Sequence, residues 1–250
     1  MGESRYTDRF LEAVERWDGS LLGPSRENRG VEGIAVFRSD FVERFVATAH
    51  PALPGVVWGP VVSLCLYLSA TAVDSALLPI VLRFVTGLLL WTLTEYLLHR
   101  FPFHRAPGSS LESKIRQFMM HGYHHEFPNH RRRLVAPLIL SVPIAVPLLI
   151  LYMAIFGSQH ALAYFAGTVS GYIAYDWIHY YTHHFRPTTR LGKFLRRYHM
   201  EHHYKDSDSH FGISSPLWDW VFGTTGTVGP TDIERMGAGM GPSSSTPDSA

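Results

Sequence analysis

The chain has 250 residues, of which 46% are apolar and only 17% are charged, and its formal net charge is +1. It contains a single cysteine, Cys65, so an internal disulfide is impossible and thiolate-rich zinc or iron–sulfur sites are excluded. Any metal ion in this protein must therefore be held by nitrogen and oxygen atoms.

The first part of the chain is polar and mixed in charge. It contains helical patches such as "DRFLEAVERW", but no basic start followed by an apolar run, so we expect no cleaved signal peptide. We predict that residues 1–54 form a cytosolic or interfacial segment ahead of a membrane domain at residues 55–224. The Gly-, Ser- and Pro-rich residues 225–250 are predicted to form a flexible tail.

Four long apolar runs occupy most of the membrane domain. Spanning a bilayer takes about 20 apolar residues. We therefore predict transmembrane helices at about 55–73, 75–98, 134–156 and 161–180, arranged as two hairpins with very short outer turns. The alternative is a soluble all-helical core protein. It is disfavoured by the length of the runs and by Pro137, Pro143 and Pro147, which membrane helices tolerate.

Positive charge is concentrated on one side of these runs. Residues 99–133 carry seven Lys and Arg residues, six more lie within residues 186–205, and the two outer turns carry none. The positive-inside rule then places both termini and both basic segments in the cytoplasm.

Histidines gather in four clusters, all in or beside the basic segments. The clusters are "HRFPFH" (His99, His104), "HGYHH" (His121, His124, His125), "HYYTHH" (His179, His183, His184) and "HMEHH" (His199, His202, His203). Residues three and four apart share a helix face, so we expect each of the two triplets to present three imidazoles to one point. His179 and His183 would form a pair, and a turn after a helix end would bring His99 and His104 together.

Ten convergent imidazoles are too many for one ion, which takes about four to six ligands, and they suit two ions with about five nitrogens each. The predicted fold is an all-α integral membrane protein with four transmembrane helices and a cytosolic helical cap that holds a histidine-rich dimetal centre.

Other readings of the histidines are weaker. A histidine-rich tract could bind metal adventitiously, but these clusters are dispersed and regularly spaced. A zinc hydrolase of the HExxH type would need its glutamate at another position than Glu201. A metal transporter would place its ligands near the bilayer midplane. His50 and His160 are isolated and are interpreted as ordinary residues.

The motifs "EYLLHRFPFH", "HGYHHEFPNHRRRLVAP", "GYIAYDWIHYYTHH", "YHMEHHYK" and "FGISSPLWDWVFGT" resemble the sterol desaturase/fatty acid hydroxylase superfamily, most closely its fatty acid 2-hydroxylases. The resemblance implies a membrane anchor under a cytosolic cap and a two-metal centre that uses O2 to hydroxylate the carbon beside an acyl carbonyl. The implied ligands are His99, His104, His121, His124, His125, His179, His183, His199, His202 and His203.

The same resemblance leaves other residues outside the ligand set. His184 would orient a ligand or hydrogen-bond to a carbonyl. His130 stands where the family commonly has Asp, and we interpret it as a loop residue because single histidines usually are. Glu95 and Asp176 lie within four residues of a ligand, and we predict that they hydrogen-bond to ligand imidazoles; an ion pair with a neighbouring Arg is the alternative. Some relatives carry a fused cytochrome b5 domain, for which residues 1–54 offer no haem-binding pattern.

The leading hypothesis is a membrane acyl 2-hydroxylase with two iron ions (Fe2+) and O2 as cosubstrate. Zinc could replace iron in purified protein. Electrons would come from a separate donor, a ferredoxin or a cytochrome b5-like protein with its reductase, and we expect no nucleic-acid partner. A desaturase or a sterol or carotenoid hydroxylase uses related chemistry and is the alternative. A non-catalytic metal-binding membrane protein is the remaining class.

Overall fold

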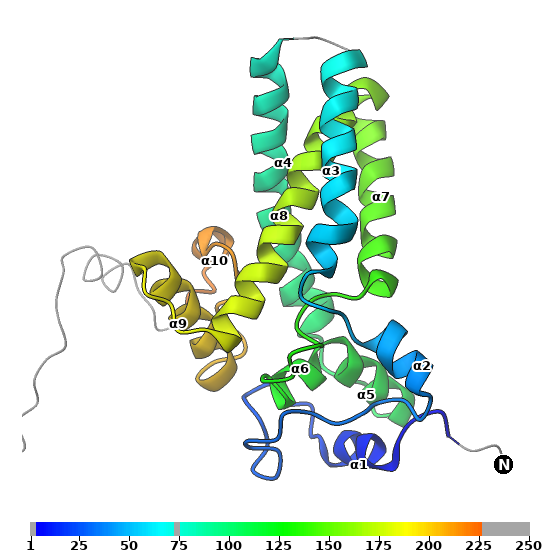
Figure 1. The fold of residues 1–250 in the computed structure, drawn as a ribbon. Coiled ribbons are helices and arrows are strands. Elements are labelled where there is room, and N and C mark those ends of the chain that lie inside the picture. Colours follow the sequence, from blue (N-terminus) through cyan, green and yellow to red (C-terminus); the bar gives the residue numbers. More distant parts are fainter. Residues whose placement is uncertain (1–3, 73–75, 227–250) are drawn as a thin grey trace, which may run out of the picture.

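The fold is described by a computed structural model, which covers residues 4–72 and 76–226. Four long helices form a shaft: α3 (Leu53–Ala72), α4 (Leu77–Leu98), α7 (Leu138–Phe156) and α8 (Ser158–His184) (Figure 1). Shorter helices make a body at one end of the shaft: α1 (Asp8–Arg16), α2 (Asp40–Val42), α5 (Leu111–Gln117), α6 (Tyr123–Glu126), α9 (Arg190–Tyr204) and α10 (Leu217–Phe222). The described residues contain no strand, only an isolated bridge between Tyr6 and Phe37, so the all-helical class is confirmed. The predicted tail lies almost entirely outside the described residues.

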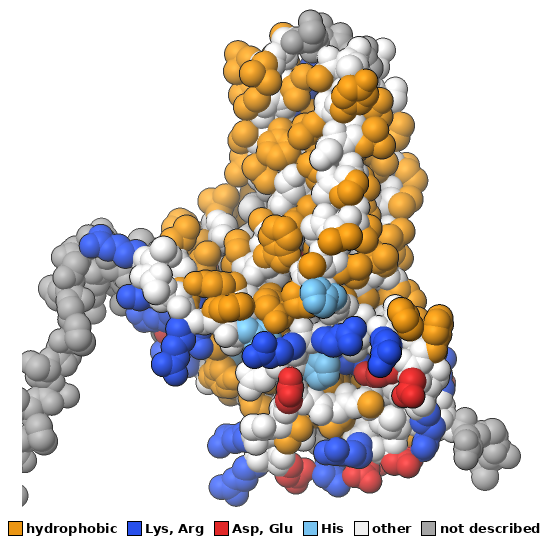
Figure 2. Space-filling view, viewed as in Figure 1, with side chains coloured by type: hydrophobic (Ala, Val, Ile, Leu, Met, Phe, Trp, Pro, Cys, Tyr) orange, Lys and Arg blue, Asp and Glu red, His pale blue; other side chains and the backbone are white. Residues whose placement is uncertain are grey.

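Three helices are long and apolar enough to cross a bilayer. These candidate spans are Leu53–Thr71, Leu77–Phe103 and Leu138–Phe156, and Figure 2 shows the apolar surface that covers the shaft. The third helix begins later than the sequence predicted because the backbone is still extended at Pro137. The structure thus contains three of the four predicted spans as clear candidates.

Helix α8 corresponds to the fourth predicted span, and it is less apolar than the three candidate spans. Its packing explains the difference. It packs against α3, α4 and α7, and much of its surface is buried between them. Because these neighbours shield it from its surroundings, α8 does not need the apolar surface that marks a span. Its crossing of the membrane stays a prediction.

Glycines let α4 and α8 approach closely. A Cβ atom at Gly87 would lie 2.1 Å from the carbonyl oxygen of Tyr164, and one at Gly167 would lie 2.0 Å from that of Phe84. A Cβ atom cannot lie this close to a carbonyl oxygen, so only glycine fits at this crossing. The hydroxyl of Thr168 donates a hydrogen bond of 3.0 Å to the Gly87 carbonyl and adds a polar tie between the helices.

The N-terminal segment packs onto the underside of the body. The Thr7 side chain caps α1 by accepting a hydrogen bond of 3.2 Å from the Phe10 amide. The buried face of α1, with Phe10 and Val14, packs with Trp17 against Phe118. A largely buried ion pair between Glu43 and Arg133 joins the segment to the chain that leads into α7. Residues that precede the shaft therefore help to enclose the histidine-bearing helices.

Candidate metal centre

The first histidines are positioned by a wide turn at the end of α4. A π-helical turn, η2 (His99–Phe103), continues α4 and includes Pro102. The His104 amide donates to the His99 carbonyl at 3.2 Å, which is the five-residue spacing of a π-helix. The two imidazole rings consequently lie with their centroids 4.8 Å apart. The sequence predicted a helix end and a turn, and the structure uses a single enlarged turn for both.

A second π-helical turn leads into the next cluster. The Ser110 side chain caps α5 by accepting from the Ser113 amide at 3.2 Å. The chain then passes through η3 (Phe118–Gly122) into α6. His121 and His125, four residues apart, bring their Nε2 atoms to 3.0 Å from each other.

The expectation that each triplet presents three imidazoles to one point is wrong. In α9, as along η3 and α6, the histidines four residues apart stay together, and His199 and His203 bring their Nε2 atoms to 3.1 Å. The remaining members, His124 and His202, point elsewhere, because consecutive residues of an α-helix are about 100° apart around its axis. Each triplet therefore contributes imidazoles to two separate places, where an ion could bind at each.

The ten histidines form two groups of five. Within each group the candidate ligand atoms all lie within 4.8 Å of one another. The first group consists of His99, His104, His121, His125 and His202, and the second of His124, His179, His183, His199 and His203. Both α6 and α9 supply side chains to both groups, so the two points are adjacent.

The geometry of each group fits a metal ion. Two nitrogens bound at right angles at about 2.05 Å from one ion lie about 2.9 Å apart. The shortest distances between Nε2 atoms within the groups range from 2.8 to 3.1 Å. The Nε2 atom of His202 and both ring nitrogens of His104 are buried without a hydrogen-bond partner. Buried polar atoms rarely stay unpaired, and an ion would satisfy them.

Burial keeps these imidazoles neutral. Outside the candidate spans, burial lowers the pKa of His121, His124 and His203 well below 6.5, and nearby imidazoles lower it further. A neutral imidazole has a free lone pair for a metal ion, whereas a protonated one has none. The groups are thus ready to bind metal at neutral pH without first losing protons.

A loop that the sequence reasoning missed orients two of the imidazoles. The Nδ1 atoms of His99 and His202 each lie 2.6 Å from a carbonyl oxygen, that of Phe211 and that of Ser209 respectively. A carbonyl only accepts, so Nδ1 carries the proton and Nε2 presents its lone pair to the centre. Asp219 holds this loop by accepting from the amides of Phe211 and Gly212 at 2.9 and 2.8 Å. The motif "FGISSPLWDW" contains this loop except for Ser209 and His210, but nothing in its spacing indicates a contact with histidines.

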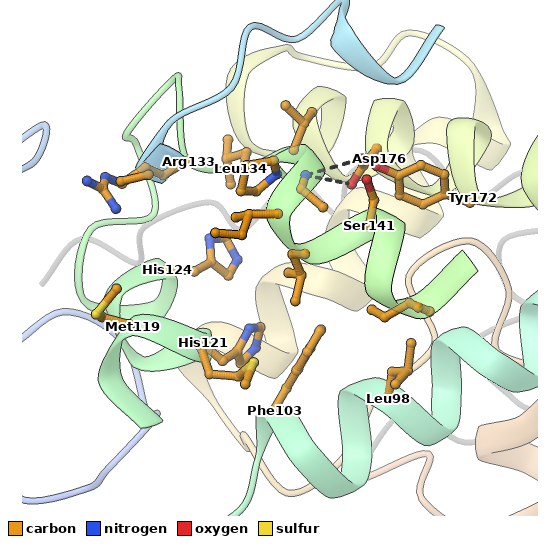
Figure 3. Close-up of a pocket in the computed structure, with 18 of the residues that line it drawn as sticks. Leu98, Phe103, Met119, His121, His124, Arg133, Leu134, Ser141, Tyr172 and Asp176 are labelled. Atoms are coloured by element: carbon orange, nitrogen blue, oxygen red, sulfur yellow. Dashed lines mark hydrogen bonds between the residues drawn. The ribbon is translucent and has the colours of Figure 1, made fainter. Parts of the chain in front are cut away.

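Contrary to the prediction, Glu95 and Asp176 do not hydrogen-bond to the imidazoles. Glu95 accepts from the amides of Ile213 and Ser214 at 2.5 and 2.8 Å, so it supports the far end of the same loop. Asp176 accepts from the Ala136 amide at 3.2 Å, where the chain enters α7 (Figure 3). Both carboxylates thus accept from backbone amides rather than from imidazoles.

His184 and His130 lie outside both groups. His184 packs against the Tyr180 ring with centroids 4.5 Å apart, and its Nε2 atom is buried without a partner. His130 is in a turn, where its Nδ1 atom accepts from the Arg132 amide at 3.3 Å, and its ring packs against Gly33.

A cavity of about 900 Å³ opens beside both groups. Figure 3 shows His121 and His124 facing into it, across from Leu98 and Phe103. The cavity continues between the shaft helices along mostly apolar side chains, among them Leu134, Ile144, Leu148, Phe165 and Val169. In the body it is also lined by charged side chains of the N-terminal segment and α5, namely Arg5, Glu112 and Arg116. Such a shape suits an amphiphile with one long apolar part.

Comparison with known proteins agrees with this arrangement. Residues 84–224 match the family model described as fatty acid hydroxylase. The chain is 40% identical over 197 residues to dihydroceramide fatty acyl 2-hydroxylase FAH1 of Arabidopsis thaliana, a match that covers 79% of this chain and 82% of the plant protein. It is 36% identical over 215 residues to fatty acid 2-hydroxylase of Rattus norvegicus, which covers 76% of this chain and 56% of the rat protein.

A solved structure is similar as well. It is described as full-length scs7p with only the hydroxylase domain visible, and it matches with a TM-score of 0.73 and 32% identity, over 89% of this chain and 80% of that one. With its two five-histidine groups at the end of a helical shaft, the chain belongs to the fatty acid hydroxylase family.

Proposed function

We propose that this protein is a membrane-bound, O2-dependent fatty acyl 2-hydroxylase. The observation that carries the proposal is that side chains of both histidine groups, His121, His124 and His179, line one apolar cavity. The names of the relatives, which are acyl 2-hydroxylases of plant and mammal, support the same reaction.

The ten clustered histidines would hold two iron ions. All-nitrogen ligation suits iron, and five donors for each ion exceed the four of a tetrahedral zinc site. Iron held there would supply the redox chemistry that O2 activation needs, which zinc lacks. The loop at residues 209–215 would keep His99 and His202 oriented throughout the reaction.

The cavity would position the substrate. Its apolar part between the shaft helices would hold the acyl chain and exclude water, while the part lined by Arg5, Glu112 and Arg116 would receive the head of the lipid. A chain bound in this direction would have its head and the carbons near its carbonyl in the part of the cavity that the body lines, where His121 and His124 also lie. This direction favours attack on the carbon next to the carbonyl over attack on the distant end of the chain.

The orientation in the membrane is part of the proposal. Residues 55–224 would form the membrane domain, with α8 as the fourth span, and residues 1–54 would cover the centre. Both termini, the body and the metals would face the cytoplasm. The support is the excess of Lys and Arg around the body and their absence from the turn at Gly157.

Lipid mass spectrometry tests the function. Cells that express the protein should accumulate acyl lipids heavier by one oxygen, with the hydroxyl beside the carbonyl, only when O2 is present. Lipids lacking two hydrogens instead would identify a desaturase. If purified protein with O2 and a chemical reductant gives neither product, the chain is a binding protein and the proposal is wrong.

A further inference from the structure

The outward face of α9 carries positive charge directly behind the metal centre. We define the α9 basic surface as Arg186, Lys193, Arg196, Arg197, Tyr204 and Lys205, which line a hollow of about 640 Å³. The inward face of the same helix bears His199, His202 and His203, all buried. One helix therefore separates the surface from both histidine groups.

The charge of this surface is only partly compensated. Glu201 is the acidic residue in the hollow, and it pairs with Arg197 and Lys205, each at 3.1 Å. Across residues 4–72 and 76–226, Arg186, Lys193 and Arg196 form no ion pair. Figure 2 shows Lys and Arg side chains gathered over the region of α9. A surface with this excess charge steers partners with an acidic face.

Aromatic rings connect the hollow with both groups. Tyr204 is 50% exposed, and its ring centroid lies 6.0 Å from that of His203. His203 belongs to the second group and stacks on His125 of the first group, with centroids 4.1 Å apart. The rings therefore form a continuous path from solvent to both histidine groups.

We propose that the α9 basic surface docks a small acidic protein that carries a one-electron redox centre and delivers electrons at Tyr204. The inference rests on the proposed function. Each hydroxylation takes one O2, two electrons and two protons; one oxygen atom enters the C–H bond and the other leaves as water. The donor is oxidised by one electron at each encounter, so two encounters complete one turnover.

The shape of this surface favours a redox protein over the membrane. Anionic headgroups also attract Lys and Arg, but they need no concave site and no path to the metals. The neighbouring helix α10 exposes Trp220, Val221 and Phe222, which suit contact with a bilayer. Membrane contact thus has an apolar element of its own, next to the basic hollow.

Charge reversal in the holoenzyme tests this proposal. The variant Lys193→Glu with Arg196→Glu is compared with Arg131→Glu with Arg132→Glu, an exposed basic pair elsewhere that gives the same change in net charge. Turnover is measured in neutral-lipid nanodiscs with two acidic probes, a reduced ferredoxin and a reduced cytochrome b5, and separately with dithionite. We expect the α9 variant to lose about tenfold or more of the donor-driven rate at low salt, and much of its salt dependence. Dithionite-driven turnover and metal content should not change.

Other results would overturn the proposal. One is an unchanged donor-driven rate in the α9 variant; another is an equal loss in both variants, which would reflect net charge alone. A loss seen only in nanodiscs that contain phosphatidylserine would assign the surface to lipid headgroups. If the unmodified protein gives no product even with dithionite, the proposed function itself has failed, and this result is distinct from a docking defect.

Tyr204 provides a second test of the path. Tyr204→Leu should slow donor-driven turnover at saturating donor without weakening donor binding, and Tyr204→Phe should restore it because the ring is kept. Equal rates for the Leu and Phe variants would exclude delivery through this ring.

Discussion

His124 and His125 are neighbours in the chain, yet they lie in different histidine groups. The same holds for His202 and His203 on α9. Helices α6 and α9 thereby hold the two groups at a fixed separation, because a shift of either helix moves candidate ligands of both groups. A substitution at one histidine removes a donor from one group only, which makes the two groups separable by experiment.

Replacing a single histidine should therefore affect one ion first. His203→Ala removes a donor from the second group, and we expect metal content to fall from two ions per chain toward one. Loss of residues that merely support ligands costs about 10–100-fold in metal affinity or activity, so turnover should fall by at least that factor. Elemental analysis and product formation, at matched expression, measure both effects.

His160→Ala is the matched control, since His160 lies in the first turn of α8, at the opposite end of this helix from His179 and His183 (Figure 1). It should keep near-normal turnover and both metals. If His203→Ala also kept both metals and full turnover, the assignment of these ten residues as ligands would be wrong.

At the scale of elements, one segment before the shaft closes over the centre. The carboxylate of Glu126, next to His125, accepts from the Ser25 amide at 3.0 Å and from the Asn28 side chain at 2.6 Å. In the same segment, Gly23 lies against Tyr204. The contacts tie residues 23–28 to both α6 and α9, and we expect them to limit the access of water to the candidate ligands.

Removing the hydrogen bonds of Glu126 should loosen residues 23–28. Glu126→Ala removes the charged acceptor of the partly buried hydrogen bonds from the Ser25 amide and the Asn28 side chain, at a cost of about 1–3 kcal/mol. We expect faster protease cleavage near residues 23–28 and faster loss of metal to a chelator. Glu27→Ala is the control, because Glu27 is exposed and its ion pair with Arg16 is on the surface. Equal chelation rates in the two variants would show that the segment does not shield the centre.

The crossing of α4 and α8 gives a test of the shaft. Gly167→Ala places a Cβ atom against the Phe84 carbonyl, so the helices must separate, at a cost of roughly 1–3 kcal/mol or more. Gly59→Ala, in α3, meets no atom within 4 Å and should change stability by less than about 1 kcal/mol. Apparent melting temperatures in detergent compare the two. A Gly167→Ala protein as stable as Gly59→Ala would mean that the close contact is not present.

At the scale of the whole molecule, sequence patterns predicted the helical class and the histidine clusters, because both depend on periodicities along a single helix. They did not predict how the triplets divide, since this division depends on where α6 and α9 lie relative to each other. They also misjudged Glu95, whose partners Ile213 and Ser214 are more than a hundred residues away. The covering of the centre by residues 23–28 likewise depends on contacts between distant parts of the chain.

The concentration of neutral imidazoles in one body makes the whole protein sensitive to acid. Burial, followed by the neighbouring imidazoles, lowers the pKa of His121, His124 and His202 far below 6.5 in the folded protein. The unfolded chain takes up protons as the pH falls below about 6.5 while the folded groups do not, so stability is kept above that pH and lost below it. The buried carboxyl of Asp219 has a pKa raised by burial and acts in the opposite direction, but the buried imidazoles outnumber such carboxyl groups.

We therefore expect the apparent melting temperature of the metal-free protein to fall steeply between about pH 7 and about pH 5.5, and to be nearly constant above about pH 7. The metal-loaded protein should keep its ions to a lower pH and release them only where it unfolds, because bound ions stabilise the folded state and its imidazoles stay deprotonated until then. Melting curves in detergent, with metal analysis after buffer exchange at each pH, measure the two effects independently of turnover. A metal-free protein whose melting temperature stayed level or rose on acidification would show that these imidazoles are not held neutral by burial.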